Sequence, residues 1–133
     1  MKSSSKIALA LLAGVALGGL AIEGLHAQAK APVYVVAEIE VTNPDAYAKE
    51  YAPKAQAVIK AAGGRFLAIG GAGAAGGKVT AFEGDPPKRV VIQVWDSMDK
   101  IKAWRTNPDY LALRKVGEKY AKFRTFAVDG VSE

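Results

Sequence analysis

The chain has 133 residues, no cysteine, one histidine (His26) and a formal net charge of +5. This length accommodates one domain at most, and the absence of cysteine excludes a disulfide framework. The basic residues are dispersed, with no run longer than Lys88-Arg89, so a nucleic-acid-binding groove is not expected.

Residues 1–29 have the pattern of a secretory signal peptide, with two lysines ahead of an apolar run. The run from Ile7 to Ile22 has 16 residues, whereas a membrane-spanning helix needs about 20. An uncleaved anchor is therefore the weaker alternative. Ala27-Gln28-Ala29 matches an A-x-A cleavage site. We expect cleavage there, a single mature domain of residues 30–133, a periplasmic or secreted location, and no membrane contact after signal removal.

The stretch from Val33 to Val41 predicts the first strand, because it is rich in β-branched residues. Alternation divides it into an apolar face (Val33, Val35, Ala37, Ile39 and Val41) and a mixed face (Tyr34, Val36, Glu38 and Glu40). We expect the apolar face to pack against helices. The mixed face is typical of a ligand cavity or a subunit interface.

A helix is predicted next, with Asn43 as its cap and Pro44 at its first position. Its expected buried stripe consists of Tyr47, Tyr51, Ala55, Val58 and Ala62. Gly63 and Gly64 end it. Pro53 removes a backbone donor in the middle of the pattern and predicts a kink or a break there.

A second strand is predicted over Arg65–Ile69, followed by the glycine-rich stretch 70–77 and a strand-like segment, Lys78–Phe82. The stretch contains G-A-G-A-A-G, which fits the dinucleotide-binding pattern. That pattern needs a helix directly after the glycines, and the residues that follow favour a strand instead. We therefore expect a flexible or bulged interruption within one long edge strand.

A third strand is predicted over Arg89–Asp96. Its two faces carry Arg89, Val91, Gln93 and Trp95 on one side and Val90, Ile92 and Val94 on the other.

Two helical segments follow, capped by Ser97 and Asn107. Their expected inward residues are Ile101, Trp104, Leu113, Val116 or Gly117, and Tyr120. A last strand over Phe123–Val128 places Arg124, Phe126 and Val128 opposite Phe123, Thr125 and Ala127.

The element order β-α-β-β-α-β predicts an α+β fold of the ferredoxin-like type, a four-stranded antiparallel sheet with the helices on one face. The other face would expose Tyr34, Val36, Val91, Trp95 and Phe126 or their neighbours. That apolar area is too large for a soluble monomer, so we expect a homodimer that closes the two sheets into an α+β barrel.

Several segments resemble the small bacterial domain-of-unknown-function family DUF1330. They are V-Y-V-V-A-E-I-E-V-T-N-P-D-A-Y, K-E-Y-A-P-K, A-A-G-G-R-F-L-A, F-E-G-D-P-P-K-R-V-V-I-Q-V-W-D-S, A-W-R-T-N-P-D-Y and F-A-V-D-G-V, which together span most of residues 33–131. The resemblance implies a dimeric α+β barrel related to cofactor-free monooxygenases, muconolactone isomerases and haem-handling barrel proteins. It implies no activity. The export segment and the expanded glycine stretch depart from the family pattern.

The residue types of the mature chain exclude much chemistry. Without histidine or cysteine, it has no Ser-His-Asp or Cys-His nucleophile system, no histidine-ligated haem, and no zinc or copper site of the usual ligands. We expect no metal and no cofactor, and no catalytic residue is assigned.

Six residues are candidates for ligand binding: Tyr34, Glu38, Arg65, Gln93, Trp95 and Arg124. A glutamate in an apolar barrel has a raised proton affinity and acts as an acid or base, while arginine or glutamine polarises a carbonyl. The competing and favoured interpretation is that Glu38 forms only an ion pair with an arginine. For Tyr47, Tyr51, Trp104 and Tyr120, core packing is favoured over ligand stacking.

Three classes of function remain. The favoured one is an exported protein that binds a small organic molecule in the barrel. The alternatives are a cofactor-free enzyme, monooxygenase-like or isomerase-like, acting on a hydrophobic carbonyl or phenolic compound, and a structural dimer without a ligand.

Overall fold

The computed structural model describes residues 31–132. The predicted signal peptide and its cleavage site lie outside these residues. The strands are β1 (Val33–Val41), β2 (Arg65–Gly71), β3 (Arg89–Trp95) and β4 (Ala121–Asp129). The helical segments are α2 (Pro44–Ala46), the π-helical turn η1 (Tyr47–Tyr51), α3 (Ala52–Ala62), α4 (Met98–Thr106) and α5 (Pro108–Glu118). No helix within residues 31–132 has both the length and the apolar content needed to cross a bilayer.

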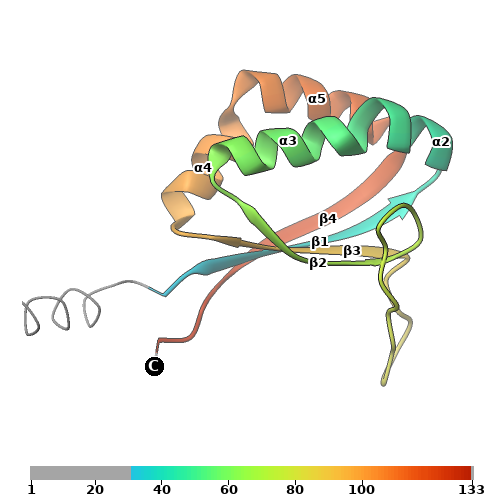
Figure 1. Ribbon diagram of the computed structural model, residues 1–133, viewed down its shortest axis with the longest axis horizontal. Helices are drawn as coiled ribbons and strands as arrows, with labels where there is room; N and C mark the ends of the chain where they lie inside the picture. The colour runs from blue at the N-terminus through green and yellow to red at the C-terminus, as the bar shows by residue number, and fades with distance from the viewer. Residues whose placement is uncertain (1–30, 133) are drawn as a thin grey trace, which may run out of the picture. The chain divides into compact units, whose positions relative to one another are not determined.

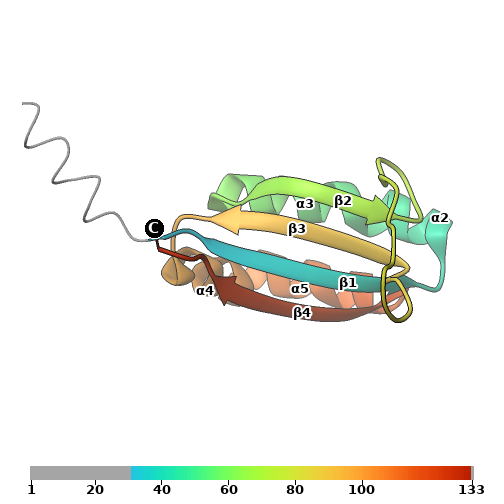
Figure 2. The same cartoon turned by 90° about the horizontal axis from the view of Figure 1, so that it is seen from below.

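The four strands form one sheet in the order β2-β3-β1-β4, and every neighbouring pair is antiparallel. The helices all lie on one face of this sheet (Figure 1). The opposite face is seen in front of the helices when the molecule is turned (Figure 2). We call these the covered face and the open face. The predicted α+β, ferredoxin-like architecture is confirmed.

The first helical region begins and breaks where its sequence predicts. The Asn43 side chain accepts a hydrogen bond from the Ala46 amide at 3.2 Å, and Pro44 follows it. Pro53 has no amide hydrogen to donate, and the turn before it widens into η1, in which the Ala52 amide bonds to the Tyr47 carbonyl five residues back. The expected break is therefore a π-helical turn. Gly63, with a φ of +110°, ends α3.

Side-chain caps also start the two later helices. The Ser97 hydroxyl accepts from the Lys100 amide at 3.2 Å, and the Asn107 side chain accepts from the Asp109 amide at 2.9 Å. Ile101 and Trp104 of α4 are buried as predicted. In α5, Gly117 is the buried one of the two predicted alternatives, and Tyr110 is buried with it. On α3, Ile59 is buried, whereas Val58 and Ala62 only pack against the core.

The strand pairing settles which residues share a face. Directly opposed residues of antiparallel strands point the same way, and β1 pairs Val33 with Trp95 and Val35 with Gln93. The inward residues of β3 are therefore Arg89, Val91, Gln93 and Trp95. The expectation that Val91 and Trp95 lie on the uncovered face is wrong. Their neighbours Val90 and Ile92 lie there instead, with Tyr34, Val36 and Phe126.

The segment between β2 and β3 differs from the prediction. Lys78–Phe82 is not a strand, because the chain folds back on itself first. The Gly71 amide bonds to the Gly77 carbonyl at 2.9 Å and the Ala72 amide bonds to the Lys88 carbonyl at 2.9 Å. Positive φ angles at Gly71 and Gly73 make this reversal possible. No helix follows the glycines within this segment, in agreement with the rejected dinucleotide motif.

Candidate functional site

A cavity of about 50 Å³ lies between the covered face of the sheet and the helices. Its lining includes the arginines Arg89, Arg105 and Arg114. It also includes the tyrosines Tyr47, Tyr51 and Tyr110. Among the described residues that line it, none is an aspartate or a glutamate. The cavity is therefore lined by hydrogen-bond donors and positive charge, and the carboxylate nearest to these arginines is that of Glu118, outside the lining, 3.8 Å from Arg114 Nε.

Arg89 is the first residue of β3 and points inward with only 4% of its surface exposed. Its Nη1 donates to the carbonyls of Ala72 at 2.9 Å and Ala74 at 3.4 Å, whereas its Nε has no partner among residues 31–132. No carboxylate within this part of the chain pairs with it. A guanidinium keeps its proton even when buried, so this site carries a permanent, largely desolvated positive charge.

Two further buried polar atoms of the described chain are also without a hydrogen-bond partner: Trp104 Nε1 and Thr125 Oγ1. Both residues line the same cavity as Arg89. Buried polar groups are nearly always bonded in folded proteins, and each exception calls for an explanation. Three polar atoms without a hydrogen-bond partner therefore belong to residues that line one space.

Two tyrosines of the cavity, Tyr47 and Tyr51, have raised pKa values and remain protonated at neutral pH. Burial raises the pKa of the Tyr47 hydroxyl, and the Arg89 guanidinium beside it opposes this shift only in part. Burial likewise raises the pKa of Tyr51, whose hydroxyl accepts from Arg114 Nη1 at 3.4 Å. The Tyr110 hydroxyl accepts from Arg105 Nη1 at 3.0 Å. The Tyr47 and Tyr51 hydroxyls thus keep their protons and can act as hydrogen-bond donors.

An aromatic stack packs beside the cavity. Trp95 lies against Trp104 with ring centroids 5.1 Å apart, and Trp104 lies 4.8 Å from Tyr110. Trp95 is fully buried, and its Nε1 donates to Gln93 Oε1 at 2.9 Å. The residues of this group that line the cavity are Gln93, Trp104 and Tyr110. Trp95 is not part of the lining and contacts Trp104 and Gln93.

The structure does not bring the candidates Tyr34, Glu38, Gln93 and Trp95 together on one face. Gln93 and Trp95 face the helices, whereas Tyr34 and Glu38 point to the open face, opposite Val94 and Val90. The physical reason is the pairing register of the strands, which decides the face of the sheet on which each side chain lies. A shift of one residue transfers a whole set of side chains to the other face, and the sequence alone left that parity undetermined.

Glu38 and Arg124 meet on the open face. They are directly opposed on β1 and β4, and Glu38 Oε2 lies 2.8 Å from Arg124 Nη1. Because the Arg124 side chain is 75% exposed, solvent screens this pair. The structure shows the ion pair that was the competing interpretation of Glu38.

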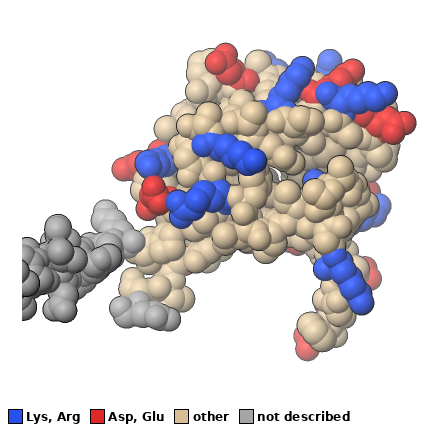
Figure 3. Space-filling model, viewed as in Figure 1, with Lys and Arg blue, Asp and Glu red and all other residues tan. Residues whose placement is uncertain are grey.

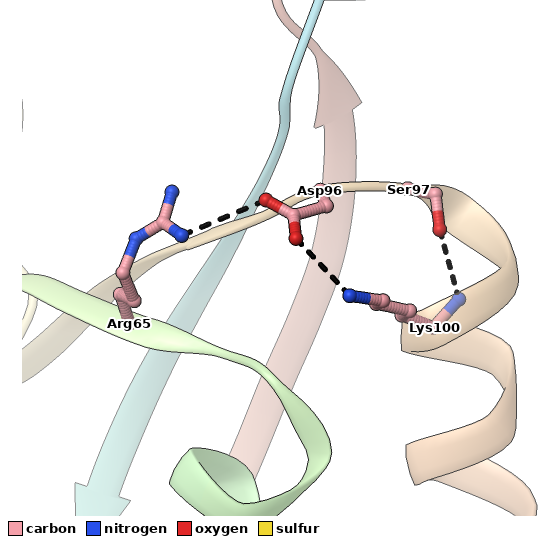
Figure 4. Close-up of polar contacts among 4 residues, drawn as sticks. All are labelled: Arg65, Asp96, Ser97 and Lys100. Carbon is pink, nitrogen blue, oxygen red and sulfur yellow. Dashed lines mark hydrogen bonds and ion pairs between the residues drawn. The ribbon is translucent and has the colours of Figure 1, made fainter.

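Arg65 forms a surface ion pair with Asp96, which also pairs with Lys100 (Figure 4). Its Nη1 lies 3.5 Å from one oxygen of Asp96, and Lys100 Nζ lies 3.1 Å from the other. Lys100 and, to a smaller extent, Arg65 hold the pKa of Asp96 below its usual value. This exposed group joins the starts of β2 and α4 to the end of β3, and it lies outside the cavity lining.

Sequence reasoning missed Arg89, Arg114 and Thr125. One signal for Arg89 was available, because it alternates with Val91, Gln93 and Trp95, and a charge within such a series lies on the face that the series buries. Tyr47, Tyr51 and Trp104 were predicted to pack in the core, and they do so while also lining the cavity. Tyr120 is partly buried against the core, as predicted, and its hydroxyl donates a hydrogen bond to Glu50. No group of three or more potential metal ligands is present within residues 31–132.

The fold is shared with solved structures of low sequence identity. SnoaB, a cofactor-independent oxygenase from Streptomyces nogalater, aligns with a TM-score of 0.54 at 15% identity, covering 77% of this chain and 96% of SnoaB. The RPA0582 protein of unknown function from Rhodopseudomonas palustris aligns with a TM-score of 0.53 at 16% identity, covering 78% and 85%. Its methylated form gives 0.57 at 17% identity, covering 77% and 83%.

Identities this low establish a common fold alone. No curated protein matches the sequence. The family model described as "Domain of unknown function (DUF1330)" matches residues 32–131. The chain therefore belongs to the DUF1330 family.

Proposed function

We propose that the protein binds a small organic anion, such as a carboxylate or a phenolate, with its charged group in the cavity between the helices and the covered face. The observation that carries this proposal is Arg89, a buried guanidinium with no carboxylate partner in the described chain and with Nε free beside the cavity. Leaving a charge buried in this way costs stability, and a bound anion recovers that cost.

The other donors around the cavity fit the same ligand. A carboxylate has two oxygens with about four acceptor positions. Arg89 Nε and Trp104 Nε1 supply two unused donors, and the tyrosine hydroxyls supply more. At about 4 Å and an effective dielectric constant near 20, two opposite charges attract by about 4 kcal/mol. The lining is therefore better suited to an anion than to a neutral or cationic molecule.

A cofactor-free enzyme is the second candidate. Its support is that the cations around the cavity would stabilise an enolate or phenolate, and that the structurally similar SnoaB is a cofactor-independent oxygenase. However, the described lining has no carboxylate or imidazole to remove a proton, and the raised pKa values of Tyr47 and Tyr51 keep their hydroxyls protonated. Without a base in the lining, an enzyme with this cavity would need a substrate that is already ionised when it binds. Ligand binding needs no such base, and it is therefore the primary proposal.

The two tryptophans of the chain provide a direct test. Benzoate is titrated into labelled protein while the two indole N–H signals are followed by NMR, with benzamide as the neutral control. Trp104 Nε1 is free, and Trp95 Nε1 is already bonded to Gln93. We expect benzoate to shift the Trp104 signal strongly and the Trp95 signal weakly, and benzamide to do neither. Equal shifts with both compounds, or no shift at all, would refute the anion site.

The same proposal includes a homodimer formed through the open face. Phe126 is 40% exposed there, next to the apolar side chains of Val36, Val90 and Ile92. The end of the loop between β2 and β3 also projects to this side of the sheet, away from the helices (Figure 1). A second copy packed on the open face would bury this apolar surface and form the expected barrel. Sedimentation analysis of residues 30–133 should show a dimer.

We also propose export, which rests only on the signal pattern of residues 1–29. The mature protein recovered from the cell envelope should begin at Lys30. N-terminal sequencing that finds Met1 retained would contradict this proposal.

A further inference from the structure

A second and larger hollow, of about 440 Å³, lies beside the cavity. It lies between the first helical region and the loop that follows β2, where the molecular surface is visibly hollowed (Figure 3). The two spaces share the lining residues Ile39, Tyr47, Ala52, Gln56 and Arg89. Arg89 therefore stands at the boundary between a small polar space and a larger one.

The walls of this hollow are mostly apolar. Val41, Pro44 and Ala48 contribute from the sheet and helix side, and the backbone of residues 72–75 contributes from the loop. The charged residues of its described lining are Lys88 and Arg89, both cationic. Lys88 Nζ is already paired with Glu40 at 3.1 Å. Arg89 is therefore the charge available to a molecule lying here.

Arg89 also holds the loop in place. Its Nη1 bonds to the Ala72 and Ala74 carbonyls, and a Cβ at Gly73 would lie only 2.8 Å from that same nitrogen. A Cβ at Gly71 would lie 2.2 Å from the Lys88 carbonyl oxygen. Because Gly71 and Gly73 have no side chains, the loop backbone can lie against the Arg89 guanidinium. The expanded glycine stretch thus forms one wall of the hollow while leaving Arg89 Nε free.

The opposite wall includes the π-helical turn. Tyr47 and Ala48 of η1 and Ala52 and Pro53 of α3 all line the hollow. Single π-turns within helices are rare and are frequent at functional sites. The π-helical turn η1 and the glycine-rich loop therefore lie on opposite sides of one apolar space. This space ends at the buried guanidinium of Arg89.

We infer that the ligand is an amphipathic organic acid, with its anionic head at Arg89 and an alkyl or aryl tail in the hollow beneath the glycine-rich loop. This inference rests on the proposed function for the position of the head. The volume of the hollow lies within the roughly 300–1,000 Å³ of drug-sized ligand pockets. A tail of several carbons buried against these walls supplies binding energy that the small polar cavity alone cannot.

A series of straight-chain carboxylates tests the tail. Acetate, butanoate, hexanoate and octanoate are titrated into the protein by calorimetry, with 1-octanol as the neutral control. Each methylene that enters the hollow should tighten binding by about fourfold. Octanoate should therefore bind far more tightly than acetate, and 1-octanol should bind more weakly than octanoate.

Two matched variants locate the tail. Ala48→Phe places a ring at the wall of the hollow, whereas Ala57→Phe places the same ring on an exposed position of α3 that lines neither space. Filling the hollow should weaken octanoate binding by at least about tenfold, the gain of roughly two buried methylenes. Acetate binding should be unchanged in both variants, and octanoate binding should be unchanged in Ala57→Phe.

The outcomes separate the two proposals. Binding that does not depend on chain length, with acetate as tight as octanoate, would overturn the tail site and leave the anion site standing. Binding that depends on length but is equal for octanoate and 1-octanol would support the apolar hollow and refute Arg89 as the head site. Octanoate binding that Ala48→Phe does not weaken would overturn the assignment of the tail to this hollow.

Discussion

The two faces of the sheet differ in whether their charged side chains are paired. On the open face and at the sheet edges, Glu38, Glu40 and Asp96 each pair with a basic residue at the surface. On the covered face, Arg89 is buried with no such partner in the described chain. The surface charges are thus paired where water would screen them anyway, whereas the Arg89 charge is left without a carboxylate partner where burial makes it costly. Stability alone would favour the reverse, and the proposed anion site on the covered face accounts for the difference.

The faces also differ in how they hold aromatic rings. Trp95, Trp104 and Tyr110 are buried and stacked under the helices, whereas Phe126 on the open face is partly exposed. The covered face therefore determines whether the domain folds. The open face is the one on which we propose that a second copy packs.

The largest effect should come from the covered face. Trp95→Ala removes a fully buried ring and leaves a cavity, which should lower the free energy of unfolding by about 3–5 kcal/mol. Leu111→Ala, at a half-exposed position of α5, should change it by at most about 0.5 kcal/mol. Urea unfolding of both variants measures this difference. A loss of less than about 1 kcal/mol for Trp95→Ala would contradict its place in the core.

An alkaline titration gives the next effect. The pKa values of Tyr47 and Tyr51 are raised in the folded protein, so the unfolded chain loses these protons first, near pH 10. The free energy of unfolding should then fall as pH rises above 10, by up to about 1.4 kcal/mol per pH unit for each tyrosine. Urea unfolding between pH 8 and pH 11 should show a shallower decline for Tyr51→Phe. The same slope in the variant and the parent would mean that Tyr51 is not desolvated.

On the open face, a charge should change assembly more than folding. Phe126→Glu should convert the dimer to monomer in sedimentation analysis, because it places a charge in the proposed interface. Its effect on the folding of the monomer should stay within about 1 kcal/mol. Leu111→Glu on the helix layer is the matched control and should remain dimeric. A Phe126→Glu dimer as stable as the parent would place the interface elsewhere.

The smallest effect should come from the open-face ion pair. Glu38→Gln and Arg124→Gln should each cost about 0.2–1 kcal/mol, because the pair is exposed to solvent. A double-mutant cycle by urea unfolding should give a coupling energy in the same range. Neither variant should alter the benzoate-induced shift of the Trp104 indole signal. A loss of that shift in Glu38→Gln would move the ligand site to the open face.

Local signals in the sequence were sufficient to predict most of the fold. The caps Asn43, Ser97 and Asn107 and the break near Pro53 each act within one helical turn, so they could be read directly. Lys78–Phe82 was wrongly predicted as a strand, because the reversal at Gly71 and Gly77 depends on backbone contacts between residues several positions apart.

The site was less predictable, because it depends on the register between strands. Alternation grouped Arg89, Gln93 and Trp95 correctly, but it could not show whether that group faced the helices or the open side. The pairing of Val35 with Gln93 decides this, and it joins residues far apart in the sequence. Arg114 and Thr125 reach the cavity only through tertiary packing.

The most direct test of the account is the stability of Arg89→Met compared with that of the parent in the absence of ligand. Methionine keeps much of the volume and removes the buried charge, and the exposed Ala72 and Ala74 backbone can turn its carbonyls to water. Arg89→Lys, which keeps a charge but loses the planar fork, is the matched variant.

We predict that Arg89→Met unfolds at the same temperature as the ligand-free parent or at a higher one, and that benzoate no longer stabilises it. A melting temperature well below that of the parent, with benzoate still stabilising the variant, would show that Arg89 serves the fold and that the covered face holds no anion site.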